Sequence, residues 1–246
     1  MFTINDFFNT GIVFKYYYDN SLVITLSAVA VMIAAYLLGS INFAIIISGK
    51  KYHDDIRSHG SKNAGMTNMM RTYGRSAAAF TLIGDAAKAI VAGIIGYAVL
   101  GQLGAFIGGL FCMVGHVFPV FSGFKGGKGV VTGFAAVLMC DPFVFPILLV
   151  LFIVIVGFTK YISLGSIMCM MLYPILHHKA YHLLSLWSMG EQQTSPYVLF
   201  TVCIAAIIIA KHWTNIKRLL NGEESKFSFK KSVKAPDSEN GEKKDK

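Results

Sequence analysis

Apolar runs of about 20 residues recur along this chain, and they constrain its fold more than any other feature. A helix needs about 20 apolar residues to cross a bilayer. Of the 246 residues, 54% are hydrophobic and only 14% are charged. A soluble domain of this length would not need so much apolar sequence. The sequence therefore predicts an all-α polytopic membrane protein that forms one compact bundle.

Seven transmembrane helices are expected from the positions of the apolar runs. Their approximate bounds are Ser21–Ile47, Ala77–Leu100, Leu103–Phe121, Val130–Met139, Phe143–Phe158, Ile162–Leu176 and Tyr197–Ala210. Polar or glycine-rich segments separate these runs, and residues 177–195 are expected to form a polar loop. The fourth run is short and ends at Asp141-Pro142, so whether the segment 130–146 crosses fully is left open.

Positive charge is distributed unevenly among the predicted loops, and this distribution indicates the topology. Alternate loops hold 19 Lys and Arg residues on one side, against Lys15 and Lys179 on the other, with Lys88 inside a span. Lysine and arginine accumulate in cytoplasmic loops of membrane proteins. The sequence therefore predicts an N-terminus outside the cell and a C-terminus in the cytoplasm.

Composition divides the chain into three regions. Residues 1–20 are rich in aromatic side chains, which suits an extracellular segment at the level of the lipid headgroups. Residues 21–231 form the seven-helix domain, and the charged residues 232–246 are expected to be a disordered cytoplasmic tail. The four cysteines lie in or beside apolar runs without Cys-x-x-Cys spacing, so we expect buried thiols rather than disulfides or a metal site.

A loop of unusual composition, residues 123–129, joins the third and fourth runs. Four of its seven residues are glycine and two are lysine. Glycine lets the backbone approach a ligand closely, and successive N–H groups with nearby cations suit a phosphate. The loop is not a Walker A motif, because Gly129 stands where that motif has Ser or Thr. A flexible basic turn that only marks the cytoplasmic side is the alternative.

The other predicted cytoplasmic loops also carry groups that suit phosphate oxygens, and all of them converge on one membrane face. The candidates are Ser61, Asn63, Asn68 and Arg71 in the first loop, Ser163 after Lys160, and His212 and Asn215 at the exit of the last span. Ser61 and Ser163 could simply cap helices, and Arg71 could be a positive-inside anchor. A helix N-terminus is itself a phosphate site, so capping and binding are compatible.

Ionisable residues inside or beside the spans allow both structural and functional interpretations. Asp85 and Lys88 lie three apart on one helix face and form either a structural ion pair or part of a site. His116 precedes the glycine-lysine loop, where a lone histidine is more often a hydrogen-bonded structural group than a base. His177 and its neighbours in the predicted polar loop lack a nearby acidic partner, so we expect them to be solvated and predict no metal site.

Together these residues resemble the membrane acyl-phosphate:glycerol-3-phosphate acyltransferase family of bacterial phospholipid synthesis, the PlsY family. The matching segments, in family order over roughly residues 21–227, are Leu38–Ile41, 60–68 with Arg71, Asp85-x-x-Lys88, Gly115–Gly129, Tyr161–Leu164 and His212–Gly222. The sequence departs from the family pattern at Lys62, Met66, Lys211, Trp213 and Thr214, which affects how glycerol phosphate is positioned more than the reaction.

The resemblance implies transfer of an acyl group from acyl phosphate to the 1-hydroxyl of glycerol 3-phosphate, giving lysophosphatidate and phosphate. It implies phosphate contacts for Ser61, Arg71, Lys128 and Ser163. It also implies substrate-binding parts for Asn63, Asn68, Gly126, Gly127, His116, His212 and Asn215. A substrate phosphate or His116 would take the hydroxyl proton, and this choice stays open. No Gly-x-Ser-x-Gly elbow is present, so no covalent acyl-enzyme is expected.

The same resemblance implies a multi-pass protein of the bacterial cell membrane with its active site on the cytoplasmic face. It implies no cofactor and no nucleic acid. Membrane lipid is an expected partner, and an upstream enzyme that makes acyl phosphate is a further one. Two other classes were weighed: a transporter or channel for an organic phosphate, which would normally show internal repeats, and a lipid-binding scaffold, which would leave the ordered motifs unexplained.

Overall fold

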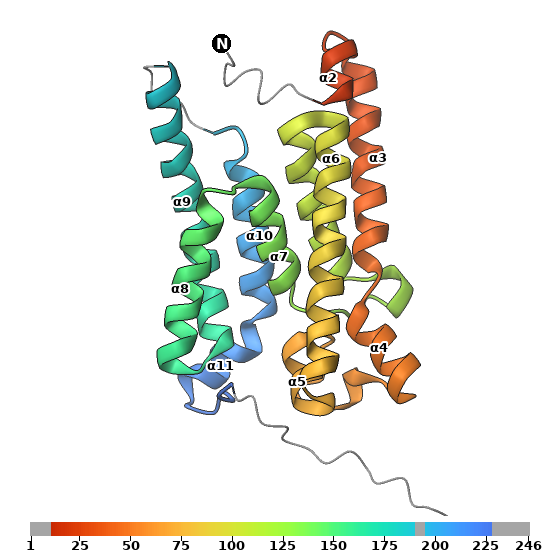
Figure 1. The fold of residues 1–246 in the computed structure, drawn as a ribbon, viewed down its shortest axis with the longest axis vertical. Helices are drawn as coiled ribbons and strands as arrows, with labels where there is room; N and C mark the ends of the chain where they lie inside the picture. Colours follow the sequence, from red (N-terminus) through yellow and green to blue (C-terminus); the bar gives the residue numbers. More distant parts are fainter. Residues whose placement is uncertain (1–10, 190–194, 228–246) are drawn as a thin grey trace, which may run out of the picture.

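The computed structural model describes residues 11–189 and 195–227, and this part of the chain consists of helices and connecting loops, without a strand (Figure 1). The helices are α2 (Ile12–Tyr17), α3 (Ser21–Ser40), α4 (Phe43–Tyr52), η1 (Ile56–Ser58), α5 (Met66–Tyr73), α6 (Arg75–Val117), η2 (Val120–Ser122), α7 (Val130–Cys140), α8 (Val144–Thr159), α9 (Ile162–Met189), α10 (Val198–Lys211) and α11 (Trp213–Leu220). The expected all-α class is confirmed.

The long helix α6 is a hairpin of two helical halves. The backbone leaves the helical region at Leu100 (φ −126°) and at Gly101, whose φ of 58° suits glycine. Beyond this break the two halves pack so closely that a Cβ on Gly96 would overlap the carbonyl oxygen of Gly104, and one on Gly108 would overlap that of Ala92. Small residues allow such close helix contact in membranes. The break separates the second and third apolar runs.

Two predicted boundaries were wrong. The first run was expected to continue to Ile47, but α3 ends at Ser40, and the side chain of Asn42 begins α4 by accepting the Ile45 N–H at 3.1 Å. The predicted polar loop 177–195 is instead helical as far as Met189, because α9 continues through Pro174. Residues 190–194 of that loop lie outside the described residues.

His177 on this extension is buried, which corrects the expectation that it is solvated without an acidic partner. Its Nδ1 lies 2.7 Å from Asp141 Oδ1, and its Nε2 lies 2.7 Å from Ser195 Oγ. The Tyr173 hydroxyl donates to the same carboxylate at 2.6 Å. Asp141 sits at the turn between α7 and α8, 36 residues away in sequence, so local spacing could not indicate the pair. The network ties α9 to neighbouring elements.

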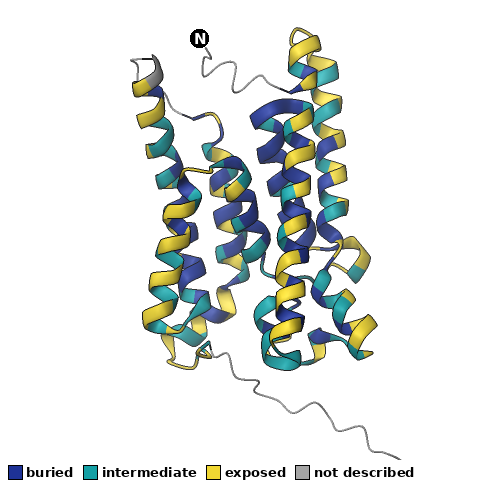
Figure 2. Ribbon diagram, in the orientation of Figure 1, coloured by how far each residue is buried: buried dark blue, intermediate teal, exposed yellow. Residues whose placement is uncertain are grey.

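Many positions on the outer faces of the bundle are exposed (Figure 2), and large apolar side chains occupy many of them. Leu22 on α3, Ile83 on α6 and Phe158 on α8 are 66%, 63% and 87% exposed. Patches of this kind mark contact with a membrane or a partner. Among the described residues, two stretches, Ser21–Tyr52 and Arg75–Ser122, are long and apolar enough to cross a membrane, and α10 with α11 forms a third, bent candidate. The count of seven crossings stays a prediction.

The loops and short helices predicted to be cytoplasmic lie at one end of the bundle. Figure 1 places α4, α5 and α11 at this end and α2 at the opposite end. Helix α7 contacts both α6 and α10, and a cluster including Met113, Val137 and Ile208 fills the space between these three helices. The expected tail 232–246 and residues 1–10 of the expected interfacial segment lie outside the described residues.

Candidate active site

A cavity of about 440 Å³ opens within the end where α5 and α11 lie, and its wall has two chemically different parts. The apolar part is formed by α6, α7 and α8, with Leu82, Ala86, Ile90, Val131, Phe134, Leu138, Phe145, Leu149 and Phe152. The polar part gathers Ser61, Asn63, Asn68, Arg71, His116, Lys128, Ser163, His212 and Asn215. Nine predicted site residues, from segments far apart in sequence, therefore line one cavity.

A chain of hydrogen bonds organises the polar part. The Lys128 ammonium donates to Asn215 Oδ1, and Asn215 Nδ2 donates to Glu224 Oε1 at 2.6 Å. The Ser163 hydroxyl donates to the same oxygen at 2.7 Å, and Arg218 Nε donates to Glu224 Oε2 at 2.7 Å. Because its amide nitrogen points at the carboxylate, Asn215 turns its oxygen toward Lys128.

The polar part carries a net positive charge. Three cations, Arg71, Lys128 and Arg218, line it together with the carboxylate of Glu224, and Asp85 is paired with Lys88 deeper in the wall. Burial, reinforced by the neighbouring Arg218, lowers the pKa of Lys128 to about 8. Burial alone would raise the pKa of Glu224, but hydrogen bonds from its partners outweigh it and lower the pKa. Such a concentration of partly desolvated cations suits a multiply charged anion.

His212 presents a hydrogen-bond acceptor to the cavity. Its Nδ1 lies 2.8 Å from the carbonyl oxygen of Ile208, which can only accept, so the Nδ1 hydrogen must occupy this bond. In the neutral ring Nε2 is then a bare acceptor. A hydroxyl group of a ligand could donate to it. The break between α10 and α11, where the chain bends by 57°, places this ring beside Asn215.

The glycine-lysine loop lies against His116, and close packing on this residue requires glycine at two positions of the loop. A Cβ on Gly126 would overlap the His116 carbonyl oxygen, and a Cβ on Gly127 would overlap its ring. The Gly127 N–H donates to that carbonyl at 3.1 Å. Gly126 and Gly127 were predicted to bind substrate, but they are not among the residues that line the cavity. They let the loop approach His116 closely enough to bring Lys128 into the cavity.

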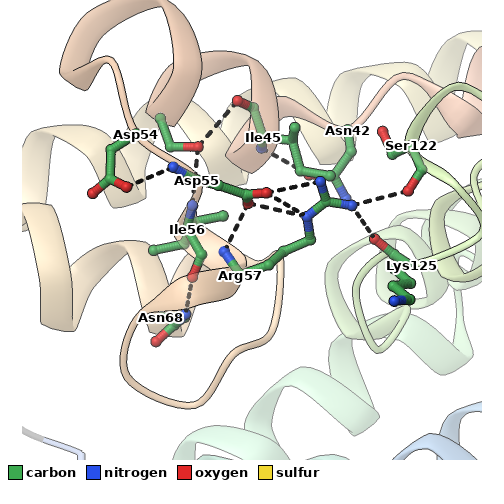
Figure 3. A network of polar contacts seen from close by, with 10 residues as sticks. Asn42, Ile45, Asp54, Asp55, Ile56, Arg57, Asn68, Ser122 and Lys125 are labelled. Carbon is green, nitrogen blue, oxygen red and sulfur yellow. Dashed lines mark hydrogen bonds and ion pairs between the residues drawn. The ribbon is translucent and has the colours of Figure 1, made fainter.

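An arginine outside the cavity anchors the start of this loop (Figure 3). The Nη1 group of Arg57 donates to the carbonyl oxygens of Ser122 at 2.9 Å and Lys125 at 3.4 Å. The carboxylate of Asp55 accepts from another edge of the guanidinium, with Nη2–Oδ2 at 2.8 Å. Lys125, the other lysine of the loop, is exposed and does not line the cavity. Of the two lysines of this loop, only Lys128 lines the cavity.

Asn68 holds the first loop in shape. Its Oδ1 accepts the Ser61 N–H at 3.0 Å, and its Nδ2 donates to the carbonyl oxygens of Ile56 at 3.1 Å and His59 at 2.9 Å. Both amide hydrogens are therefore engaged with backbone. Asn68 thus positions Ser61 at the cavity, and any contact with substrate would have to be made through its remaining oxygen lone pair.

Sequence reasoning did not single out several residues of the cavity wall, among them Thr67, Arg218 and Glu224. Arg218 falls inside the segment His212–Gly222, but it was not singled out from several nearby cations. Glu224 lies in an acidic, glycine-containing stretch that has the composition of a tail. The N–H of Phe227 donates to the Lys160 carbonyl at 2.6 Å and folds this stretch back onto the start of α9. No periodicity signals such a contact.

Residues 29–222 match a family model described as glycerol-3-phosphate acyltransferase. The chain belongs to this family. Glycerol-3-phosphate acyltransferases of Syntrophomonas wolfei and Finegoldia magna are 40% and 37% identical to it, over 82% and 79% of this chain and 97% and 93% of theirs. The chain is therefore an acyltransferase, and the expected family is confirmed.

Two solved structures of a glycerol-3-phosphate acyltransferase have the same fold. They are crystal structures of PlsY (YgiH), described as an integral membrane glycerol 3-phosphate acyltransferase, in its glycerol 3-phosphate form and its lysophosphatidic acid form. Their TM-scores are 0.69 and 0.67, at 34% and 33% identity, over 82% of this chain and 96% of each of theirs. The relatives thus handle a phosphorylated three-carbon alcohol and its acylated product.

Proposed function

We propose that this enzyme transfers an acyl group from acyl phosphate to the 1-hydroxyl of glycerol 3-phosphate, as the first acylation step of phospholipid synthesis. The observation that supports this proposal best is the two-part cavity. Its polar part offers three cations to phosphate groups, and its apolar part offers a wall of aliphatic and aromatic side chains to an acyl chain. The solved relatives with glycerol 3-phosphate and lysophosphatidic acid point to the acceptor and the product.

In the proposed complex, Ser61, Arg71, Lys128 and Ser163 contact the phosphate groups of the two substrates. Ser163 donates its hydroxyl hydrogen to Glu224 in this structure, so it must turn to contact a phosphate. An arginine fork and a lysine ammonium are complementary donors for phosphate oxygens. Asn63 lies at the same wall and supplies a further amide.

His212 and Asn215 orient the glycerol part of the acceptor. The bare Nε2 of His212 accepts from a hydroxyl group, and this contact sets which hydroxyl faces the acyl carbonyl. Gly126 and Gly127 act indirectly by letting the loop pack on His116, and Asn68 acts by holding Ser61. Holding both substrates in one cavity replaces a bimolecular encounter with a local one.

The two substrates supply both reacting groups of the chemical step. The 1-hydroxyl oxygen attacks the carbonyl carbon of the acyl phosphate, a carbon–oxygen ester bond forms, and the bond from the carbonyl carbon to the phosphate oxygen breaks. Phosphate leaves with its electron pair, and the hydroxyl proton passes to a phosphate oxygen or to a side chain of the site. Lys128, beside the developing negative charge, stabilises it.

Two observations support acyl phosphate as the acyl donor, one from the sequence and one from the cavity. The chain has no His-x-x-x-x-Asp segment of the kind found in familiar CoA-dependent acyltransferases. The polar part of a 440 Å³ cavity is also small for a nucleotide carrier. We further propose that the site faces the cytoplasm of a bacterial cell, since 19 of 22 Lys and Arg residues fall on that side of the expected topology. An enzyme that makes acyl phosphate would then supply the donor there.

Purified enzyme supplied separately with acyl phosphate, acyl-CoA and acyl-carrier-protein thioester, each with glycerol 3-phosphate, tests the donor. We expect lysophosphatidate from acyl phosphate alone. The Lys128→Met variant, prepared in parallel, controls for contaminating acyltransferases. The proposed donor would be refuted if the wild type used either thioester about as fast as acyl phosphate and the Lys128→Met variant did not.

A further inference from the structure

Three buried ionisable residues form a cluster at the cavity wall, and the reaction as described so far gives no part to two of them, Asp85 and Lys88. Asp85 and Lys88 lie on the first half of α6, and His116 lies near the end of the second half. They are 1%, 4% and 3% exposed. The Lys88 ammonium lies 2.9 Å from Asp85 Oδ1 and 3.0 Å from His116 Nδ1. Asp85 and His116 both border the cavity.

The hydrogens of Lys88 determine which nitrogen of His116 is protonated. An ammonium has three hydrogens and cannot accept. Two of them go to the carbonyl oxygens of Gly39 at 2.9 Å and Ile41 at 2.6 Å. The third has two possible acceptors, Asp85 Oδ1 and His116 Nδ1.

Geometry favours the histidine as the third acceptor. Asp85 Oδ1 has no hydrogen-bond partner of acceptable angle among the described residues, although it forms an ion pair with Lys88. The contact from Lys88 to His116 Nδ1 does meet hydrogen-bond geometry. A hydrogen on Nδ1 would face the ammonium across 3.0 Å, donor against donor. Nδ1 is therefore bare, and the hydrogen of the neutral ring sits on Nε2.

The protonated Nε2 is directed toward the glycine-lysine loop. A Cβ on Gly127 would overlap this atom, so the ring nitrogen lies against the segment that presents Lys128. Within residues 11–189 and 195–227, no protein group accepts from Nε2. An N–H at a cavity wall without a protein acceptor is an open donor position.

We propose that Asp85 and Lys88 are positioning residues that fix His116 as an Nε2–H donor to the acyl donor, at its phosphoryl oxygens or at the carbonyl oxygen where negative charge develops. A donor fixed in advance stabilises that charge without reorganisation. In this state His116 cannot also take the hydroxyl proton at Nε2. The catalytic part of this inference rests on the proposed function, whereas the protonation of the ring does not.

Nitrogen-15 NMR of the histidine-labelled enzyme in detergent tests the ring directly and needs no substrate. Protonated and bare ring nitrogens differ in chemical shift, and the His116→Gln spectrum identifies the His116 signals. We expect a protonated Nε2 and a bare Nδ1. In Lys88→Met the hydrogen should move to Nδ1, since Asp85 Oδ1 is 3.5 Å away and would be the remaining acceptor. A wild-type ring protonated on Nδ1 would overturn the proposal even if the enzyme uses acyl phosphate.

Two substitutions separate a donor from a general base. Glutamine at position 116 extends an amide N–H to about the place of Nε2, whereas asparagine reaches only about as far as Nδ1. We expect His116→Gln to retain kcat within about tenfold and His116→Asn to lose about 10²-fold, as for loss of one oxyanion donor. If both variants melt like the wild type and lose activity equally, the donor role is wrong.

The positioning role has its own readout. Lys88→Met leaves Asp85 buried without a partner and risks unfolding, so the double variant Asp85→Asn/Lys88→Met is the matched form. We expect kcat of the folded double variant to fall about tenfold with little change in KM for glycerol 3-phosphate. A double variant whose kcat equals that of the wild type would remove Asp85 and Lys88 from the reaction.

Discussion

Replacing Lys128 by methionine should abolish most of the activity while leaving the fold intact. Methionine keeps about the length of the side chain and removes its charge. The other two cations of the polar part cannot take its place, because Arg218 is held by Glu224 and Arg71 has its own proposed phosphate contact. A charged hydrogen bond is worth about 1.5–3 kcal/mol. Loss of a group that stabilises developing charge lowers kcat by about 10²–10³-fold, or about 3–4 kcal/mol. We therefore expect kcat/KM to fall at least 10²-fold.

The pH dependence provides a second, independent measure of the same group. The pKa of Lys128 is lowered to about 8 by burial and nearby cations. The cation needed for phosphate is present below this pH and lost above it, so kcat/KM of the free enzyme should fall as pH rises through about 8. Bound phosphate raises this pKa again, so kcat should persist to higher pH. Lys128→Arg, if active, should show no such fall, because arginine keeps its charge.

The neighbouring lysine of the same loop is the matched control. Lys125→Ala removes an equal charge from an exposed position outside the cavity and should change kcat/KM less than threefold, about the effect of a screened surface charge. Initial rates of lysophosphatidate formation measure all of these variants. If folded Lys128→Met stays within threefold of the wild type, or if the wild-type kcat/KM is flat to pH 10, the assignment of the phosphate site to this loop is refuted.

Three further predictions concern other parts of the site and its orientation. Arg71→Lys should lower kcat/KM about tenfold, because a lysine cannot donate as a planar fork, and a full retention of activity would remove Arg71 from phosphate binding. Glu224→Gln should raise KM for glycerol 3-phosphate about tenfold, because it weakens the hydrogen bonds that hold Asn215. Glu223 is an exposed neighbour, so Glu223→Gln should leave KM unchanged. Equal KM values for the two variants would contradict the network. In a cysteine-free background, Ser122→Cys should not react with an impermeant thiol reagent in intact cells, because the predicted topology places it in the cytoplasm. Asp19→Cys should react, because the same topology places it outside. The reverse pattern would reject the topology.

Much of the fold could be predicted from apolar runs because membrane helices need long, uninterrupted apolar sequence. The helices α7, α8 and α10 begin and end within one or two residues of the expected bounds. The break between α3 and α4 at Ile41–Asn42 was not predicted, because the only feature that marks it is the Asn42 side-chain cap inside an apolar stretch. The continuation of α9 escaped because its polar residues are buried by contacts with distant parts of the chain, as His177 shows with Asp141.

Most of the candidate site could be predicted because its residues fall in short motifs, all of them in or next to loops expected on one side of the membrane. Lys128, Ser163 and His212 do line one cavity. The glycines of the loop were expected to bind phosphate, but sequence could not reveal that Gly126 and Gly127 pack against His116. Glu224 was missed because its contacts to Ser163 and Asn215 depend on how the chain folds back after α11. Which group a side chain contacts depends on tertiary packing rather than on motif spacing.

The central claim is that both substrates occupy one cavity together and that the acyl group moves directly between them. Initial rates measured while acyl phosphate and glycerol 3-phosphate are both varied test this claim most directly, with phosphate and lysophosphatidate quantified in the same samples. We expect intersecting double-reciprocal lines and equal amounts of the two products. Parallel lines, with phosphate released before glycerol 3-phosphate is added and an acyl group retained on the enzyme, would contradict it.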